Sequence, residues 1–281
     1  MTTTGGPSAI GNDAPKPVNV HREVVAVRSV QIGIFMVAIL LWQYIPTIHV
    51  LSSNISLFNR FYVSSPSSIG ATTWDLLTGT HHLPLVWPYL RVTVEATVIG
   101  SAVGLVLGAV FGLVFSSFPL LAQVANAYIV LFNSIPRVAL IPIFVLLVGA
   151  TIAASVISVV TIVFFLGFFN AFEGGRAVQQ EMIDNAQLLG ASRWKILLYV
   201  RAPSAGAWTF AAVPNAISFG LIVAVTTELL AGIQGIGALL LTSTTNIEAN
   251  VTFAVIVILS VVGLILYWGS TLLRDRLLRW Q

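Results

Sequence analysis

The chain has 281 residues, of which 57% are hydrophobic and only 8% are charged. Because soluble domains contain roughly 25% charged residues, this composition excludes an ordinary soluble protein and indicates an integral membrane protein. The net charge of +3 does not indicate nucleic-acid binding, and the absence of cysteine excludes a disulfide framework and a thiolate metal site.

The first residues differ from the rest in composition. Residues 1–27 are rich in Thr, Gly, Pro and Asn, and we expect a disordered cytoplasmic tail there and not a cleavable signal. Residues 28–281 are expected to form the transmembrane domain. A helix needs about 20 apolar residues to cross a bilayer, and the apolar segments of this domain are residues 30–48, 92–115, 125–148, 152–172, 207–230 and 251–272. The sequence therefore predicts an all-α membrane protein with six transmembrane helices.

A polar loop separates the first two predicted spans. Residues 49–90 are punctuated by prolines and are predicted to contain one interfacial helix near residues 67–77. His81 and His82 are adjacent, so they cannot share one side of a helix to chelate a metal. We expect a solvated outer loop that is free to touch a delivery protein, and no metal site.

The second predicted span carries glycine at every fourth position, at Gly100, Gly104, Gly108 and Gly112. Residues at this spacing lie on one helix face, and small residues allow two helices to approach closely in lipid. This row is predicted to be a helix-packing seam. It serves either packing within one chain or an interface between subunits, and the first is favoured because most helix contacts in a bundle are internal.

Basic residues orient the spans, because Lys and Arg concentrate in short cytoplasmic loops. With both termini cytoplasmic, ten of the 13 basic residues lie inside. They are Lys16, Arg22, Arg28, Arg176, Arg193, Lys195, Arg201, Arg274, Arg276 and Arg279. The same topology places the polar segment 173–206, between the fourth and fifth spans, in the cytoplasm.

Segment 173–206 is predicted to form two helices joined by a turn. Apolar residues recur at helical spacing over residues 176–189, which indicates an amphipathic helix. Gly190 can adopt the left-handed conformation that ends a helix, and Ser192 can cap the next helix, which Pro203 limits. The result is a compact elbow at the membrane surface.

This elbow resembles a known motif. It contains Asp184-Asn185-Ala186, then after three residues Gly190, after nine more residues Val200, and after one more residue Ala202-Pro203. This pattern resembles the cytoplasmic EAA loop of ATP-binding-cassette (ABC) importer permeases. Asn185 and Ala202 replace the Ala and Leu of the family pattern. Other segments resemble permeases of the nitrate, sulfonate and taurine group, namely residues 63–66, 134–142 with Gly149, 190–194, and 232–237 with Glu228.

The resemblance, which covers residues 30–275, implies a type I importer permease fold in the cell (inner or plasma) membrane. In such permeases the first elbow helix is the coupling helix, which docks on a cytoplasmic ATPase subunit. The matching residues are Asp184, Ala186 and Gly190, with Leu189 and Ala191 as neighbours in the contact. The implied partners are two ATPases that bind ATP and Mg, a second permease subunit that makes a homodimer, and an external solute-binding protein.

Arg137 lies between Pro136 and Pro142, where missing amide donors loosen the helix and free carbonyls can line a cavity. Its guanidinium could steady an anionic substrate. Alternatively it pairs with an acid such as Glu95 or Glu228, or reaches the water edge. Polar contacts in the same pathway are expected from Asn133, Ser134 and Asn170. Glu228 itself would repel an anion, so it is interpreted as a structural or gating group.

The predicted function is that of a non-catalytic permease subunit for a small anion such as nitrate, sulfonate, taurine or a carboxylate. The chain contains no Gly-x-x-x-x-Gly-Lys-Ser/Thr loop, so ATP hydrolysis must come from a partner, and no cofactor is expected on this chain. The alternative is an ion-coupled secondary transporter or channel, which would require inverted repeats or several ionisable groups along one path. A membrane-embedded enzyme is a third class.

Overall fold

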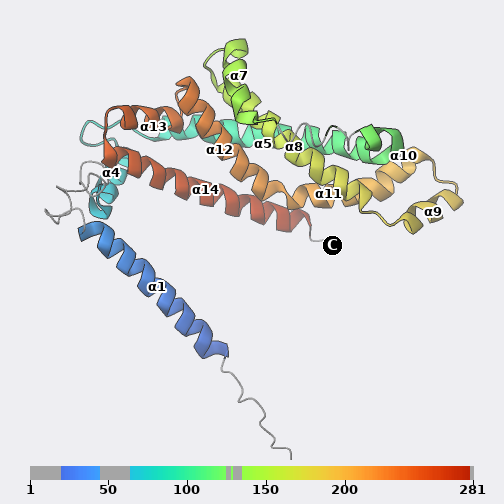
Figure 1. Ribbon diagram of the computed structural model, residues 1–281, viewed down its shortest axis with the longest axis horizontal. Helices are drawn as coiled ribbons and strands as arrows, with labels where there is room; N and C mark the ends of the chain where they lie inside the picture. The colour runs from blue at the N-terminus through green and yellow to red at the C-terminus, as the bar shows by residue number, and fades with distance from the viewer. Residues whose placement is uncertain (1–19, 45–63, 125–127, 129–134, 279–281) are drawn as a thin grey trace, which may run out of the picture. The chain divides into compact units, whose positions relative to one another are not determined.

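A computed structural model describes residues 20–44, 64–124, 128 and 135–278 (Figure 1). The chain divides into two compact units, residues 1–59 and residues 60–281, and each is described by itself. The first unit contributes α1 (Val20–Tyr44). Residues 20–27, which we expected to belong to the disordered tail, are therefore helical, and the rest of that tail lies outside the described residues.

Helices make up the second unit, and no β-strand occurs among the residues that the structure describes. In chain order they are α4 (Pro66–Thr78), α5 (Trp87–Ser117), α7 (Ile141–Val148), α8 (Ile152–Arg176), α9 (Gln180–Leu188), α10 (Arg193–Ile196), α11 (Ala202–Ala211), α12 (Val213–Ala231), α13 (Ile236–Thr245) and α14 (Ala249–Leu277). The predicted all-α class is confirmed, and α4 corresponds to the helix expected near residues 67–77.

Within the described residues, five helices are long and apolar enough to cross a membrane. They are Val27–Tyr44, Trp87–Ser117, Ile152–Arg176, Val213–Ala231 and Ala249–Leu277, and they match the first, second, fourth, fifth and sixth predicted spans. Of the third span, 125–148, much of the first half lies outside the described residues. Its second half is the shorter apolar helix Arg137–Val148.

The fifth span begins later than predicted. We placed its start at residue 207, but α11 ends at Ala211 and α12 begins at Val213. Pro214 lies in the first turn of α12, where its missing N–H would have no helical partner in any case. The proline therefore marks a new helix start, which the hydropathy pattern alone does not reveal.

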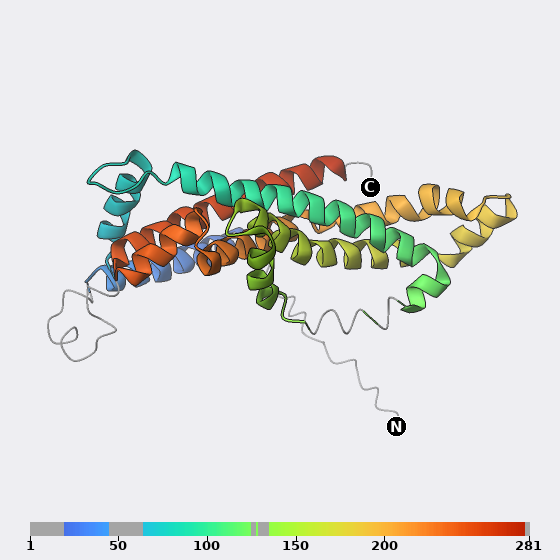
Figure 2. The same ribbon diagram turned by 90° about the horizontal axis from the view of Figure 1, so that it is seen from above.

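The core of the second unit is the contact between α5 and α8, which lie side by side (Figures 1 and 2). The four glycines of α5 face α8 at this contact. A Cβ atom added at Gly108 would lie 2.2 Å from the backbone oxygen of Phe164, and one at Gly112 would lie 2.4 Å from that of Phe168. Glycine therefore allows the two backbones to approach more closely than any other residue would, within this one chain.

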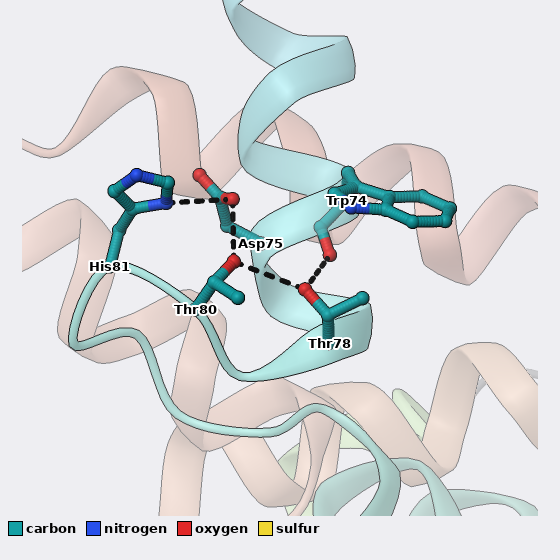
Figure 3. A network of polar contacts seen from close by, with 5 residues as sticks. All are labelled: Trp74, Asp75, Thr78, Thr80 and His81. Atoms are coloured by element: carbon teal, nitrogen blue, oxygen red, sulfur yellow. Dashed lines mark hydrogen bonds and ion pairs between the residues drawn. The ribbon is translucent and has the colours of Figure 1, made fainter.

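The α4–α5 connection is held by a polar network (Figure 3). The Asp75 carboxylate accepts a 2.7 Å hydrogen bond from the Thr80 hydroxyl and lies 3.0 Å from Nδ1 of His81. These two contacts lower the pKa of Asp75 below its ordinary value, with Thr80 contributing most. At the end of α4, the Thr78 hydroxyl donates to the carbonyl oxygen of Trp74 at 2.8 Å. The side chain of His81 is 79% exposed, so the histidine lies in a solvent-facing turn.

Candidate functional site: the elbow between α8 and α11

Of the predicted elbow segment 173–206, the first residues belong to α8 and the last to α11. The elbow proper, residues 177–201, connects these two helices and projects from one end of the second unit (Figures 1 and 2). Its first helix is shorter than the predicted 176–189, because α9 spans Gln180–Leu188. Arg176 is instead the last residue of α8. There its guanidinium lies 5.4 Å from the centre of the Phe172 ring and 3.9 Å from the Glu173 carboxylate.

The turn after α9 has well-defined backbone geometry. Gly190 has a φ of 80°, in the left-handed region that favours glycine. Its N–H donates to the carbonyl of Gln187 at 2.9 Å, and the N–H of Ala191 donates to the carbonyl of Ala186 at 2.9 Å. This pair of bonds satisfies two carbonyls at the helix end. The Ser192 side chain then accepts from the Lys195 N–H and caps α10, so both predicted caps occur in the structure.

The tip of the elbow exposes two large apolar side chains. Leu188 is 85% and Leu189 is 90% exposed, whereas Ile183 on the same helix is only 5% exposed. Exposed apolar groups gathered at one place indicate an interaction surface. Leu188 was not among the predicted contact residues, although the consecutive leucines at the end of an amphipathic helix are a signal that could have found it.

The other predicted contact residues gather around the same turn. Asp184 is exposed, and its carboxylate accepts a 2.9 Å hydrogen bond from the Gln180 side chain one turn earlier. Ala186 and Ala191 are partly buried, and Gly190 is exposed. A partner surface approaching the tip would therefore meet the leucines, the glycine and one oriented carboxylate.

The second arm of the elbow is continuous with the bundle. The π-helical residues Leu197–Arg201 lead directly into α11, and the N–H of Ala202 donates to the carbonyl of Leu197. Pro203 was predicted to limit the helix that Ser192 caps. The α-helical turn α10 ends at Ile196, before the proline, but the chain stays helical through the π turn, so the proline marks the start of a new helix and not the end of the helical arm. The proline lies in the first turn of α11, where the wider π turn before it accommodates the missing N–H.

Three contacts attach the base of the elbow, its second arm with the start of α11, to α5, to the residue after α5 and to α8. A guanidinium N–H of Arg201 donates to the backbone oxygen of Ser116. The Ser204 hydroxyl donates to the backbone oxygen of Gly174 at 2.7 Å. The rings of Phe118 and Trp194 meet edge to face at 6.0 Å.

The predicted pathway residues lie away from the elbow tip. Arg137 begins the 3-10 helix Arg137–Leu140 before α7, and its guanidinium lies 4.6 Å from the centre of the Phe165 ring on α8. The Asn170 side-chain amide donates to the backbone oxygen of Leu166 at 2.8 Å. Asn133 and Ser134 lie outside the described residues.

Glu228 fastens α13 to α5 and α12 near the opposite end of the unit. The residue is fully buried, and its Oε2 accepts from the Thr93 hydroxyl at 2.8 Å and from the Gly237 N–H at 3.0 Å. A Cβ added at Gly235 would lie 2.2 Å from the carboxylate carbon. The glycine-rich segment before α13 therefore closes around the carboxylate, which caps the amino-terminal end of that helix.

Comparison with known proteins gives consistent matches. A family model described as binding-protein-dependent transport system inner membrane component matches residues 104–279. The riboflavin transport system permease protein RibX of Chloroflexus aurantiacus is 31% identical over 227 residues, which cover 81% of this chain and 83% of that protein. The taurine transport system permease protein TauC of Escherichia coli is 26% identical over 163 residues, 58% of this chain and 59% of that protein.

Solved structures show the same fold. An inward-facing MetNI methionine ABC transporter matches with a TM-score of 0.56 and 18% identity, covering 73% of this chain and 97% of that chain. An amino acid ABC transporter crystallised with histidines matches with a TM-score of 0.56 and 19% identity, covering 74% of this chain and 99% of that chain.

Proposed function

Because this chain belongs to the family of binding-protein-dependent transport system inner membrane components, and is therefore a multi-pass permease subunit of an ABC importer, we propose that its elbow is the docking element for a cytoplasmic ATPase. The observation that carries the proposal is the exposure of Leu188 and Leu189 at the tip. Apolar side chains on a polar, projecting segment are stabilised by a groove on a soluble partner.

In this proposal two copies of the chain form one pathway, with an ATPase under each elbow and a solute-binding protein on the opposite face. The elbow and both termini are then cytoplasmic. ATP and Mg²⁺ bind to the ATPases, and the closing of the ATPase pair draws the elbows together. The base contacts at Ser116 and Gly174 transmit this shift to α5 and α8. The energetic link is the differential contact of the elbow in the two states.

Replacing Gly190 by valine is expected to abolish coupling. A non-glycine residue at a φ of 80° costs about 1–2 kcal/mol, and a β-branched one more, so the turn would change conformation and misplace the leucines. Co-expression of the tagged chain with the ATPase encoded beside it, followed by co-purification and transport-stimulated ATPase assays, measures this loss.

The matched control is Gly206→Ala on α11, where an added Cβ meets nothing within 4 Å and φ is not left-handed. This variant should retain the ATPase. Normal coupling in the Gly190 variant would contradict the docking proposal. Transport by the purified chain alone in liposomes would favour an ion-coupled secondary transporter instead.

For the cargo we propose a small solute with an anionic group such as a sulfonate, which the Arg137 guanidinium would steady; the Phe165 ring holds that guanidinium in place. Relatives named for taurine and for aliphatic sulfonates support this class, whereas the relative named for riboflavin represents a competing cargo without such a group.

Arg137→Gln is expected to raise KM for taurine uptake about tenfold, as the loss of one charge-assisted contact implies. Arg137→Lys should retain most uptake, and riboflavin uptake serves as the comparison. Unchanged taurine uptake in Arg137→Gln contradicts the anion proposal and leaves the coupling proposal standing.

A further inference from the structure

An apolar groove runs along the second unit beside the elbow, between α5, α11, α12 and the end of α14. Its volume is about 470 Å³, and its lining includes Ala102, Leu113, Ala205, Ile217 and Leu273. The α5 part of the lining extends from residue 98 to residue 113, about 22 Å at 1.5 Å per residue. One leaflet of the hydrocarbon core is about 15 Å thick, so the groove is long enough for a lipid chain.

The elbow-side end of this groove is cationic. Arg201 directly precedes the lining residue Ala202 and donates to the backbone oxygen of Ser116, and Arg274 directly follows the lining residue Leu273. Arg274 also lies 2.7 Å from the carboxylate of Asp275, so the two arginines and this acid together carry a net charge of +1. Both arginines are partly buried, and α11 contacts α14 in this part of the unit (Figure 1). Burial lowers the pKa of Arg201, because the guanidinium has lost part of its hydration. An anion at this end would restore favourable contacts to the charged side chain.

We propose that this groove binds one anionic phospholipid, with an acyl chain along α5 and the phosphate group at Arg201 and Arg274. A phospholipid combines an apolar chain with a negatively charged phosphate group. The chain matches the apolar lining of the groove, and the phosphate matches the end of the groove beside the arginines. A second copy of the chain that covered this end with an apolar helix would bury the net positive charge left after the Arg274–Asp275 pair, which costs free energy. Basic clusters where helices leave the membrane favour anionic head groups.

Native mass spectrometry of the full-length chain tests this site. The chain is extracted mildly from vesicles that contain equal amounts of phosphatidylglycerol and phosphatidylcholine, and the bound lipids are counted. The wild-type chain is expected to retain phosphatidylglycerol in preference to phosphatidylcholine. Arg274→Gln should lower this preference about fivefold, the effect of one basic residue near an anionic surface. Arg91→Gln is the matched control, because Arg91 is an exposed arginine near the other end of α5.

A second pair of variants tests the groove without changing charge. Ala102 lines the groove at an exposed position, so Ala102→Phe should fill it and lower the retention of both lipids. Val103 is 42% exposed and is not part of the lining, so Val103→Phe should leave retention unchanged. Equal retention of the two lipids by the wild-type chain overturns the proposal. So does an Ala102→Phe variant that retains lipid but no longer self-associates, since the groove would then hold a second copy.

Discussion

Gly108→Ala is expected to lower the free energy of unfolding by about 1–3 kcal/mol, the range for overpacking a close contact. The added Cβ would lie 2.2 Å from the backbone oxygen of Phe164 and 2.7 Å from the backbone nitrogen of Phe168. Neither atom can rotate away as a side chain would, so α5 and α8 must move apart along the whole contact. The side chains that pack between them, such as Val163, then lose contacts as well. Denaturant or thermal unfolding of the purified chain in detergent measures the loss.

Gly269→Ala on α14 is the matched control for this variant. An added Cβ there meets nothing within 4 Å, and alanine has a higher helix propensity than glycine by up to about 1 kcal/mol. The control should therefore be as stable as the wild-type chain or more stable. If Gly108→Ala unfolds like Gly269→Ala, the two helices do not approach each other as closely as the structure indicates.

Glu228→Ala is expected to lower the free energy of unfolding by about 2–4 kcal/mol, because it removes the shared acceptor of two buried donors. The Gly237 N–H would lose its carboxylate partner, and the Thr93 hydroxyl would keep only its 3.2 Å contact to the backbone oxygen of Tyr89. The Thr93 hydroxyl also accepts from the Ile236 N–H, and without Glu228 it would no longer be held in the orientation that this bond needs. The start of α13 would then be held to α5 by fewer hydrogen bonds. Unfolding in detergent measures the stability, and proteolysis between α12 and α13 reports the local opening.

Two further variants serve as comparisons: one removes the charge of Glu228 but keeps an acceptor oxygen, and the other removes an exposed carboxylate elsewhere, on α5. Glu228→Gln keeps an acceptor oxygen for the Gly237 N–H and should lose less stability than Glu228→Ala. Glu95→Ala removes a partly exposed carboxylate that lies 3.8 Å from Arg91 one turn away, and such pairs contribute only about 0.3–0.5 kcal/mol. A Glu228→Ala variant as stable as Glu95→Ala would contradict the role of the Glu228 carboxylate in holding α13 to α5 and α12.

Local properties of the chain explain which predictions succeeded. Apolar runs of sufficient length located the five long helices, because the cost of burying polar backbone and side chains in lipid depends on each segment alone. The turn of the elbow was found from Gly190, because a left-handed φ excludes most other residues. Two helix boundaries in the elbow segment differ from the prediction. The first helix begins at Gln180 and not at Arg176, and the chain stays helical through the π turn into a new helix that begins beside Pro203. α8 extends to Arg176 and α11 follows directly on the π turn, because these two helices pack on each other.

The sequence by itself determined the membrane setting, the order of most spans, and an elbow with a glycine turn between the fourth and fifth. It also placed four glycines on one face of α5. Only the tertiary structure decided what that face meets, which leucines are exposed at the elbow tip, and that Glu228 binds the Thr93 hydroxyl, 135 residues away in the chain. The physical reason is that periodicity and turn chemistry act within a few residues, whereas burial and pairing depend on segments that only folding brings together.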